Sequence, residues 1–299
     1  MRRPRHFLRG FTLIEMVIVI TISGIIAVIL AMIIRGPVNG IDAQMKRAEV
    51  VDMAESALRR MQRDIRASLP NSVRIRSTAG NTGDATCPTN ASVCVIEILR
   101  TLDGGRYRTS PPGNANARFQ FGIPETDFDV IGALQTLNPA DPLLTTYSMV
   151  VNNQATTGTT YNAYFGDNRT LMAVGTTSTT HISMSSKNFG AYLASPRQRF
   201  FIVDTPVTYL CDTTAGTLTR YQGYTITSNH ALMDTDAELT AAGGVGSRVA
   251  QKVVACRFTY QSGVSSRAGL TTMELTIQDS ATPSEPVRLI HQVHVYNVP

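Results

Sequence analysis

The sequence has few of the residue patterns that catalysis or metal binding requires. It contains no Cys-x-x-Cys pair, and neither His181 nor His230 has a recognisable nucleophile partner. His291 and His294 form a His-x-x-His pattern, but a strand would point these two side chains to opposite faces, so they are not expected to share a metal ion. The absence of these patterns argues against an enzyme, and we expect no catalytic residue.

Phosphate-binding and calcium-binding patterns are also incomplete. The glycine-rich stretch 243–246 is not followed by the Lys-Ser/Thr of a P-loop, so we interpret it as a flexible turn. The acidic run 234–238 could offer oxygen ligands to Ca²⁺, although such a run is more often a solvated loop. We therefore expect no cofactor and no metal site, and leave open whether this run binds Ca²⁺.

The chain has little net charge once its first ten residues are set apart. It carries 27 Lys and Arg against 22 Asp and Glu, a net charge of +5. The first ten residues contain no acid and four of the basic residues, so the remaining chain has 23 basic and 22 acidic residues. The four are Arg2, Arg3, Arg5 and Arg9. With a net charge of +1, residues 11–299 lack the positive field that binds phosphates, so no nucleic-acid partner is expected.

Charge is almost absent from the run that follows. Between Phe11 and Ile34, 24 residues contain one formal charge, at Glu15. At about 1.5 Å per residue, a helix of this length crosses a hydrocarbon core of about 30 Å. Its fifteen Phe, Leu, Ile and Val residues outweigh the cost of one buried charge, about 2.5 to 3.5 kcal/mol. We therefore expect a membrane helix over 11–35, and the basic flank predicts a cytoplasmic N-terminus.

The junction between the basic flank and the apolar run has a distinctive sequence, because Gly10, Phe11 and Glu15 occur there in a fixed spacing. Arg9-Gly10 is followed by Phe11-Thr-Leu-Ile-Glu15-Met. In an ordinary secretory signal, small residues follow the apolar core, which is discarded on cleavage. A cut between Gly10 and Phe11 would instead leave the apolar helix on the mature chain. This arrangement resembles the class III leader of type IV pilins and pseudopilins.

The resemblance implies roles for three residues. Gly10 matches the residue before the prepilin peptidase cut, Phe11 the new N-terminus that the same enzyme methylates, and Glu15 the acid used in assembly. An unpaired carboxylate in lipid is costly and by default faces a partner, here the Phe11 amine of a neighbouring subunit. The alternative is a tolerated carboxylate near the headgroups of a simple anchor.

Later segments narrow the resemblance. The runs 199–211, 218–221 and 292–299 look like minor pilins of the mannose-sensitive haemagglutinin (MSHA) pilus, the MshO kind, and similar patterns occur in minor pseudopilins of type II secretion. This implies a minor structural subunit, and a head of about 230 residues would crowd a fibre of many copies, which favours a place in a priming or tip complex. Its implied partners are other major and minor pilins, prepilin peptidase, the inner-membrane assembly platform and the membrane. The resemblance places the chain in the bacterial inner membrane with a periplasmic head, and then in a surface pilus. A membrane-anchored adhesin is the other alternative.

A second helical segment follows the apolar run. Its apolar residues recur at steps of three and four, which predicts one buried face. They are Ile41, Met45, Ala48, Val51, Ala54, Leu58, Met61 and Ile65. Pro37 is expected to kink or loosen the helix, and Leu69-Pro70-Asn71 to end it. We expect this face to pack on the chain's own head.

After Pro70 the apolar period changes to two, which predicts strands. The expected strands lie at 72–76, 93–99, 147–151, 199–203, 207–210, 218–226, 249–260, 270–278 and 287–295. A short helix is considered at 127–137. The fold class expected is α+β, a long N-terminal helix packed on an antiparallel, β-rich, pilin-like head. The domains expected are the leader 1–10, the transmembrane and assembly helix 11–35, the soluble half of the helix 36–69 and the head 70–299.

The four cysteines fit an exported head. An even number in such a domain predicts disulfides. Three pairings are possible, and we favour Cys87 with Cys94, which would close a short loop, and Cys211 with Cys256, which would join two strands.

Overall fold

The computed structural model describes residues 11–77, 86–87, 91–109, 118–155, 158–173, 177–263, 268–279 and 285–295. The expected leader, including Gly10, therefore lies outside the described residues. The chain divides into two units, Met1–Glu49 and Val50–Pro299, which are described separately below. The α+β architecture expected from the sequence is confirmed: a long apolar helix leads into a helical segment that packs on antiparallel sheets.

One helix, α1 (Leu13–Arg66), runs for 54 residues and contributes to both units. Its backbone is helical through residues 36 and 37, where the sequence predicts a kinked or loosened turn. A proline removes one N–H donor, and here the helix continues on both sides of that position. Within the first unit, the span Leu13–Arg35 has a mean hydropathy of 3.1 and no buried residue.

In the described residues of the second unit, twelve strands form two sheets. The larger, nine-stranded sheet contains β1 (Arg74–Ser77), β2 (Val93–Tyr107), β3 (Pro124–Ile131), β4 (Ser148–Val151), β5 (Arg169–Leu171), β6 (His181–Asn188), β7 (Arg199–Asp212), β8 (Thr217–Gln222) and β9 (Val245–Gln251). Its main path runs β5-β4-β7-β2-β3-β6, while β1 pairs with β2 and β8 joins β7 to β9. The smaller sheet is β10 (Val253–Gln261), β11 (Gly269–Ile277) and β12 (Val287–Val295), in that order.

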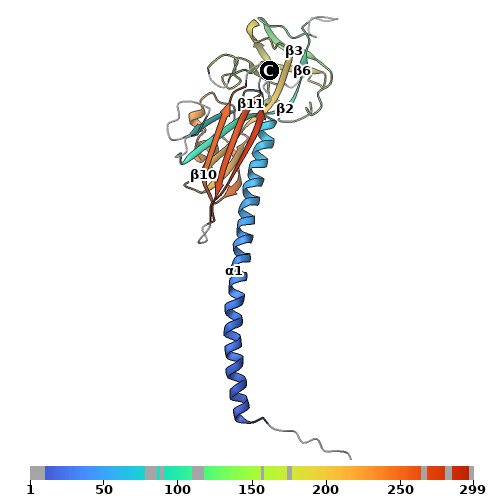
Figure 1. The fold of residues 1–299 in the computed structure, drawn as a ribbon. Coiled ribbons are helices and arrows are strands. Elements are labelled where there is room, and N and C mark those ends of the chain that lie inside the picture. Colours follow the sequence, from blue (N-terminus) through green and yellow to red (C-terminus); the bar gives the residue numbers. More distant parts are fainter. Residues whose placement is uncertain are drawn as a thin grey trace, which may run out of the picture. The chain divides into compact units, whose positions relative to one another are not determined.

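The remaining elements are short. A six-residue helix, α2 (Asp236–Ala241), precedes β9, and 3₁₀ turns lie at Leu144–Thr146, Ala191–Leu193 and His230–Leu232. Figure 1 shows the orange and red strands of the smaller sheet beside the last, light-blue turns of α1. The end of α1 is thus part of the folded second unit.

Two local predictions need correction. The segment 249–260 is two strands, because Lys252 has a left-handed φ of 58° and separates β9 from β10. The short helix considered at 127–137 is wrong, since β3 occupies residues 124–131. Phe128 and Val130 alternate with Asp127 and Asp129, so their period is that of a strand with one buried face.

The first hydrophobic cluster joins α1 to both sheets. Ala54, Leu58, Met61 and Ile65 are at most 1% exposed and pack with residues of β2, β7, β10, β11 and β12. Burying each larger apolar side chain contributes about 1.5 to 3 kcal/mol. The predicted stripe is therefore buried from Ala54 onward, whereas its first two residues, Ile41 and Met45, are exposed.

A second cluster lies around the later part of β2 and the first part of β7, with β3, β4 and β6. Phe119, Phe128 and Phe200 are at its centre, with ring centroids about 5 Å apart. Gly105 on β2 permits this packing, because a Cβ there would approach the Phe200 ring to 2.9 Å. β2 and β7 are paired over most of their length and so belong to both clusters.

Two disulfides tie the head together. Cys87 is bonded to Cys94, and Cys211 on β7 is bonded to Cys256 on β10. The second bond links the nine-stranded sheet to the three-stranded sheet, both of which contact α1. The pairings are those favoured from the sequence.

Candidate assembly surface

The start of α1 presents an exposed apolar surface. Phe11 is 77% exposed and Leu13 is 83% exposed, and every residue of the Leu13–Arg35 span is accessible. Because apolar side chains occur all around this span, a single core-facing stripe does not account for it. Such a surface requires lipid or other helices to cover it.

Glu15 has a local role at the beginning of the helix. The Glu15 amide donates to Thr12 Oγ1 at 3.3 Å, as in the N-terminal capping pattern Thr-x-x-Glu. A carboxylate in the first turn also interacts favourably with the helix dipole, by about 0.3 to 1 kcal/mol. Neither interpretation of Glu15 from the sequence, an assembly acid or a tolerated carboxylate near the headgroups, includes this cap, although Thr12 three positions earlier is a visible signal.

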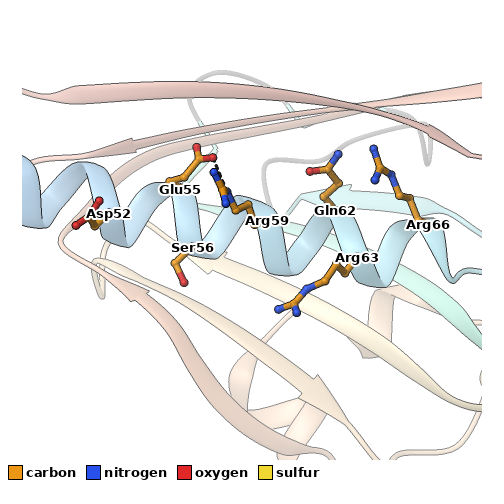
Figure 2. Close-up of a pocket in the computed structure, with 7 residues that line it drawn as sticks. All are labelled: Asp52, Glu55, Ser56, Arg59, Gln62, Arg63 and Arg66. Atoms are coloured by element: carbon orange, nitrogen blue, oxygen red, sulfur yellow. Dashed lines mark hydrogen bonds and ion pairs between the residues drawn. The ribbon is translucent and has the colours of Figure 1, made fainter.

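In the second unit, the face of α1 opposite the core is polar. It forms a groove of about 680 Å³ lined by Asp52, Glu55, Ser56, Arg59, Gln62, Arg63 and Arg66. Figure 2 shows Glu55, Gln62 and Arg66 on one side of the helix and Ser56 and Arg63 on the other. Acids lie at the first end of this charged face and arginines at the second, so the face is electrically polarised along the helix.

The centre of the charged face is occupied by an ionic network. Arg59 Nε donates to Glu55 Oε1 at 2.7 Å, drawn as a dashed line in Figure 2, and His291 Nε2 on β12 lies 3.1 Å from Glu55 Oε2. The hydrogen bond from Arg59 lowers the pKa of Glu55, with a further contribution from His291. His294, by contrast, is exposed on the other face of β12. The two histidines of the His-x-x-His pattern therefore lie apart.

Near its end, α1 is held to the nine-stranded sheet through Asp64. Tyr209 Oη donates to Asp64 Oδ2 at 2.7 Å, and Arg220 Nε donates to the same oxygen at 2.6 Å. Burial raises the pKa of Tyr209, and the Asp64 carboxylate raises it further. The Tyr209 phenol therefore remains a neutral donor. The hydrogen bonds from Tyr209 and Arg220 to Asp64 hold the end of α1 on the nine-stranded sheet.

The most buried charges form a separate pair. Arg74 Nη2 lies 2.8 Å from Glu97 Oε1, with the two side chains 2% and 0% exposed. The guanidinium also donates to the Thr227 carbonyl at 2.9 Å and stacks 3.6 Å over the Tyr164 ring. Burial alone would lower the pKa of Arg74, but the Glu97 carboxylate raises it above its usual value. Sequence periodicity gave no sign of this pair, because its members are separated by 23 residues.

The acidic run 234–238 has other bonding partners in the fold. Thr235 caps α2 and exchanges hydrogen bonds with Glu238, Asp234 pairs with Arg76 at 2.7 Å, and Asp236 accepts from Tyr221. Within the part of the chain that the structure describes, no group of three His, Cys, Asp or Glu residues is placed to hold a metal ion. These carboxylates serve helix capping and ion pairing.

Comparison with known proteins identifies the N-terminal segment. Residues 8–31 match the family model of the prokaryotic N-terminal methylation motif. No curated protein and no solved structure matches the chain. The motif is the class III motif of the type IV pilin and pseudopilin superfamily, and the chain is a prepilin-like, structural protein. The motif implies cleavage by prepilin peptidase, anchoring in the inner membrane and assembly with pilins.

Proposed function

We propose that this chain is a minor pilin of a type IV pilus, of the MSHA (MshO) kind, cleaved between Gly10 and Phe11. The supporting observation is a matched methylation motif on an apolar helix with no buried residue in its span. The proposed parts are the leader 1–10, the assembly helix 11–35, the soluble half 36–69 and the head 70–299. A head of this size would crowd a fibre of many copies, which favours a place in a priming or tip complex.

Assembly depends on Glu15 and on the new amino terminus. Cleavage frees the Phe11 amine, which is N-methylated and pairs with Glu15 of a neighbouring subunit. Two unit charges about 4 Å apart attract by about 4 kcal/mol at an effective dielectric constant of 20. That is comparable with the cost of about 2.5 to 3.5 kcal/mol for placing one charge in the membrane. The pair offsets the penalty that the unpaired carboxylate would carry, which favours packed helices over dispersed ones.

Because Glu15 also lies at a capping position, the test must keep the cap. Gln occupies this capping position as well as Glu does, so Glu15→Gln preserves the cap and removes the charge. We expect normal cleavage and strongly reduced incorporation into pili, measured by immunoblotting of sheared fibres. Thr12→Ala is the matched control, since it removes the cap oxygen and leaves the charge. Normal incorporation of the Glu15→Gln variant would reject the pairing mechanism.

The processing claim has its own measurement. Mass spectrometry of the assembled protein should find an N-methylated phenylalanine at Phe11 as the first residue. An intact leader on assembled protein would overturn the claim.

Deletion of the gene separates the alternatives. Loss of surface pili supports a pilus subunit, whereas blocked export of folded proteins with normal pili identifies a type II secretion pseudopilin. Normal pili that no longer adhere would identify an adhesin. The latter two outcomes contradict the proposal.

A further inference from the structure

The second hydrophobic cluster is enclosed by a small, closed barrel of strands. Six strands form the path β5-β4-β7-β2-β3-β6, and the two ends of this path meet. Just after β5, the Ala173 amide donates to the Ser183 carbonyl of β6 at 2.9 Å, and Met172 forms a bridge with Met184. Ligand sites are common on loops at the mouth of a barrel, because the strands hold the loops in place.

Two connections leave this barrel side by side. Val151, the last residue of β4, pairs with Phe200 near the start of β7. The connection after β4, at residues 152–155 and 158–168, and the connection before β7, at 189–198, therefore begin at the same end of the barrel. Asn152 joins them, because its Nδ2 donates to the Ala194 carbonyl at 3.2 Å.

Each of these connections contributes one accessible tyrosine. Tyr192, on the 3₁₀ turn Ala191–Leu193, is 51% exposed, and Tyr161 is partly exposed. Their ring centroids lie 5.4 Å apart with the ring planes at 79°. Within the part of the chain that the structure describes, neither tyrosine hydroxyl makes a hydrogen bond. The tyrosine pair, Tyr161 and Tyr192, therefore offers aromatic surface and two available hydroxyl groups.

The backbone holds both rings in position. Tyr161 has a left-handed φ of 56°, which is unusual for a bulky residue. Its amide donates to Asp167 Oδ2 at 2.6 Å, and its carbonyl accepts from the Gln154 amide at 3.0 Å. The Tyr192 ring lies against Gly190, where a Cβ would come within 2.3 Å of the ring. Groups that are already ordered lose little further freedom when a ligand binds.

The side chains near the tyrosine pair are polar and uncharged. Residues 152–166 and 188–196 contain no Asp, Glu, Lys or Arg. Gln154 is exposed and donates from Nε2 to Asn152 Oδ1 at 2.8 Å, while its Oε1 accepts no hydrogen bond from any described residue. Thr159 and Thr160 are exposed beside Tyr161 in the chain. This composition does not suit a ligand that carries phosphate or carboxylate groups, because such groups are bound by cations.

We propose that the tyrosine pair and Gln154 bind a neutral oligosaccharide. A sugar ring has a face of C–H groups that packs on an aromatic ring, and its hydroxyl groups both donate and accept hydrogen bonds. The tyrosine hydroxyls and Gln154 Oε1 supply matching groups without a charge. This inference concerns the head alone and does not depend on the proposed function, since a pilin and a pseudopilin can both carry such a site.

Two other roles for the tyrosines make different predictions. Tyr161 packs partly on the second cluster, but Tyr192 does not belong to that cluster, so folding alone does not account for the exposed ring. A stable contact with another protein would bury about 800 Å² on each side around an apolar centre. The exposed neighbours named above are instead polar, which favours a ligand rich in hydroxyl groups.

The experiment uses the full-length protein in a detergent that has no sugar headgroup. The protein is applied to an array of neutral oligosaccharides built from hexose and N-acetylhexosamine units, with sulphated and sialylated oligosaccharides for comparison. We expect retention on neutral oligosaccharides. The affinity for a retained oligosaccharide is then measured by titration calorimetry, and Tyr192→Ala should weaken it about tenfold because the exposed ring is lost.

Two further variants separate the position of the ring from its presence. Gly190→Ala keeps Tyr192 but displaces its ring, so binding should weaken by a smaller factor. Leu232→Ala is the matched control, since Leu232 is 52% exposed on another 3₁₀ turn, His230–Leu232, and should leave binding unchanged. All three substitutions replace or displace exposed side chains, so the variants should melt at the wild-type temperature.

Several outcomes overturn the proposal. These are no retention of neutral oligosaccharides, retention of the charged ones alone, or equal affinities for Tyr192→Ala and Leu232→Ala. A glycoprotein with neutral oligosaccharides, immobilised before and after their enzymatic removal, tests the contact with another protein. Retention that persists after removal assigns the tyrosine pair to a protein partner and overturns the saccharide site, whereas retention that disappears supports it.

Discussion

The two halves of α1 have the same secondary structure and opposite surroundings. In the first half, the Leu13–Arg35 span is apolar on every side and has no buried residue. In the second half, Leu58 and Met61 are completely buried against the chain's own sheets, and the charges lie on the outer face. The first half therefore depends on other molecules for burial, whereas the second obtains it from its own head. The first half therefore offers its surface to lipid or other helices, while the second half stabilises the fold of the head.

The largest effect should come from opening the disulfide between the two sheets that contact the second half. Replacing Cys211 and Cys256 with Ala removes a bond that closes 45 residues and should destabilise the head by about 4 kcal/mol in the loop-entropy model. Removing the bond between Cys87 and Cys94, which closes seven residues, should cost about 2.5 kcal/mol. Urea unfolding of the soluble region measures both. Equal losses for the two bonds would contradict the loop-length argument.

A matched pair of truncations tests the comparison directly. Leu58→Ala leaves a cavity in the first cluster and should lower the free energy of unfolding by about 3 kcal/mol. Ile25→Ala, at a residue that is 61% exposed, should leave unfolding of the head unchanged. Thermal unfolding of the full-length protein in detergent measures both variants. A comparable loss in Ile25→Ala would break the division between the two halves.

The polar tie at the end of α1 should contribute less than the apolar face. Asp64→Asn removes the negative charge that Tyr209 and Arg220 share, which should cost about 2 kcal/mol for hydrogen bonds to a charged group. Denaturant unfolding gives the value. Asp52→Asn is the control, because this exposed carboxylate lies on the outer face and should have little effect. An equal decrease in the free energy of unfolding for Asp64→Asn and Asp52→Asn would show that the bonds from Tyr209 and Arg220 to Asp64 add no stability of their own.

The smallest effect concerns the network on the charged face. The pKa of Glu55 is lowered from 4.5, so its contribution is present above that pH and is lost as pH falls through the lower, folded-state value. The melting temperature of the wild type should therefore decrease slightly more steeply below about pH 4.5 than that of Glu55→Gln. Parallel curves for the two proteins would show that the network adds nothing to folding.

The sequence predicts those parts of the molecule that depend on neighbouring residues. The membrane span follows from one uninterrupted apolar run, and the buried face from Ala54 onward follows from its helical spacing. The helix considered at 127–137 is wrong because the alternation of Phe128 and Val130 with carboxylates is the period of the strand observed at 124–131. Local patterns are informative because hydrogen bonding and side-chain direction repeat within each element.

Features that join distant residues could not be predicted in the same way. Arg74 on β1 contacts Tyr164 in the loop before β5, and only the positions of β1, β2 and this loop in the tertiary fold bring the two side chains together. The division of the head into separate clusters depends on how β2 pairs with β7, and no single strand reveals that register. The groove on α1 likewise required knowing which face of the helix the sheets leave uncovered.

The long pairing of β2 with β7 has a further consequence for how the head can change in evolution. The chain leaves the first cluster along β2 and returns along β7, and Tyr107 and Gln198 meet through a backbone hydrogen bond of 2.9 Å. The intervening residues, 108–198, therefore form an insertion whose two ends are adjacent. Exposed loops within this segment can change in length while the strands that hold α1 keep their connections. Its buried contacts cannot be exchanged so freely, because Tyr164 stacks on Arg74 and β4 pairs with β7.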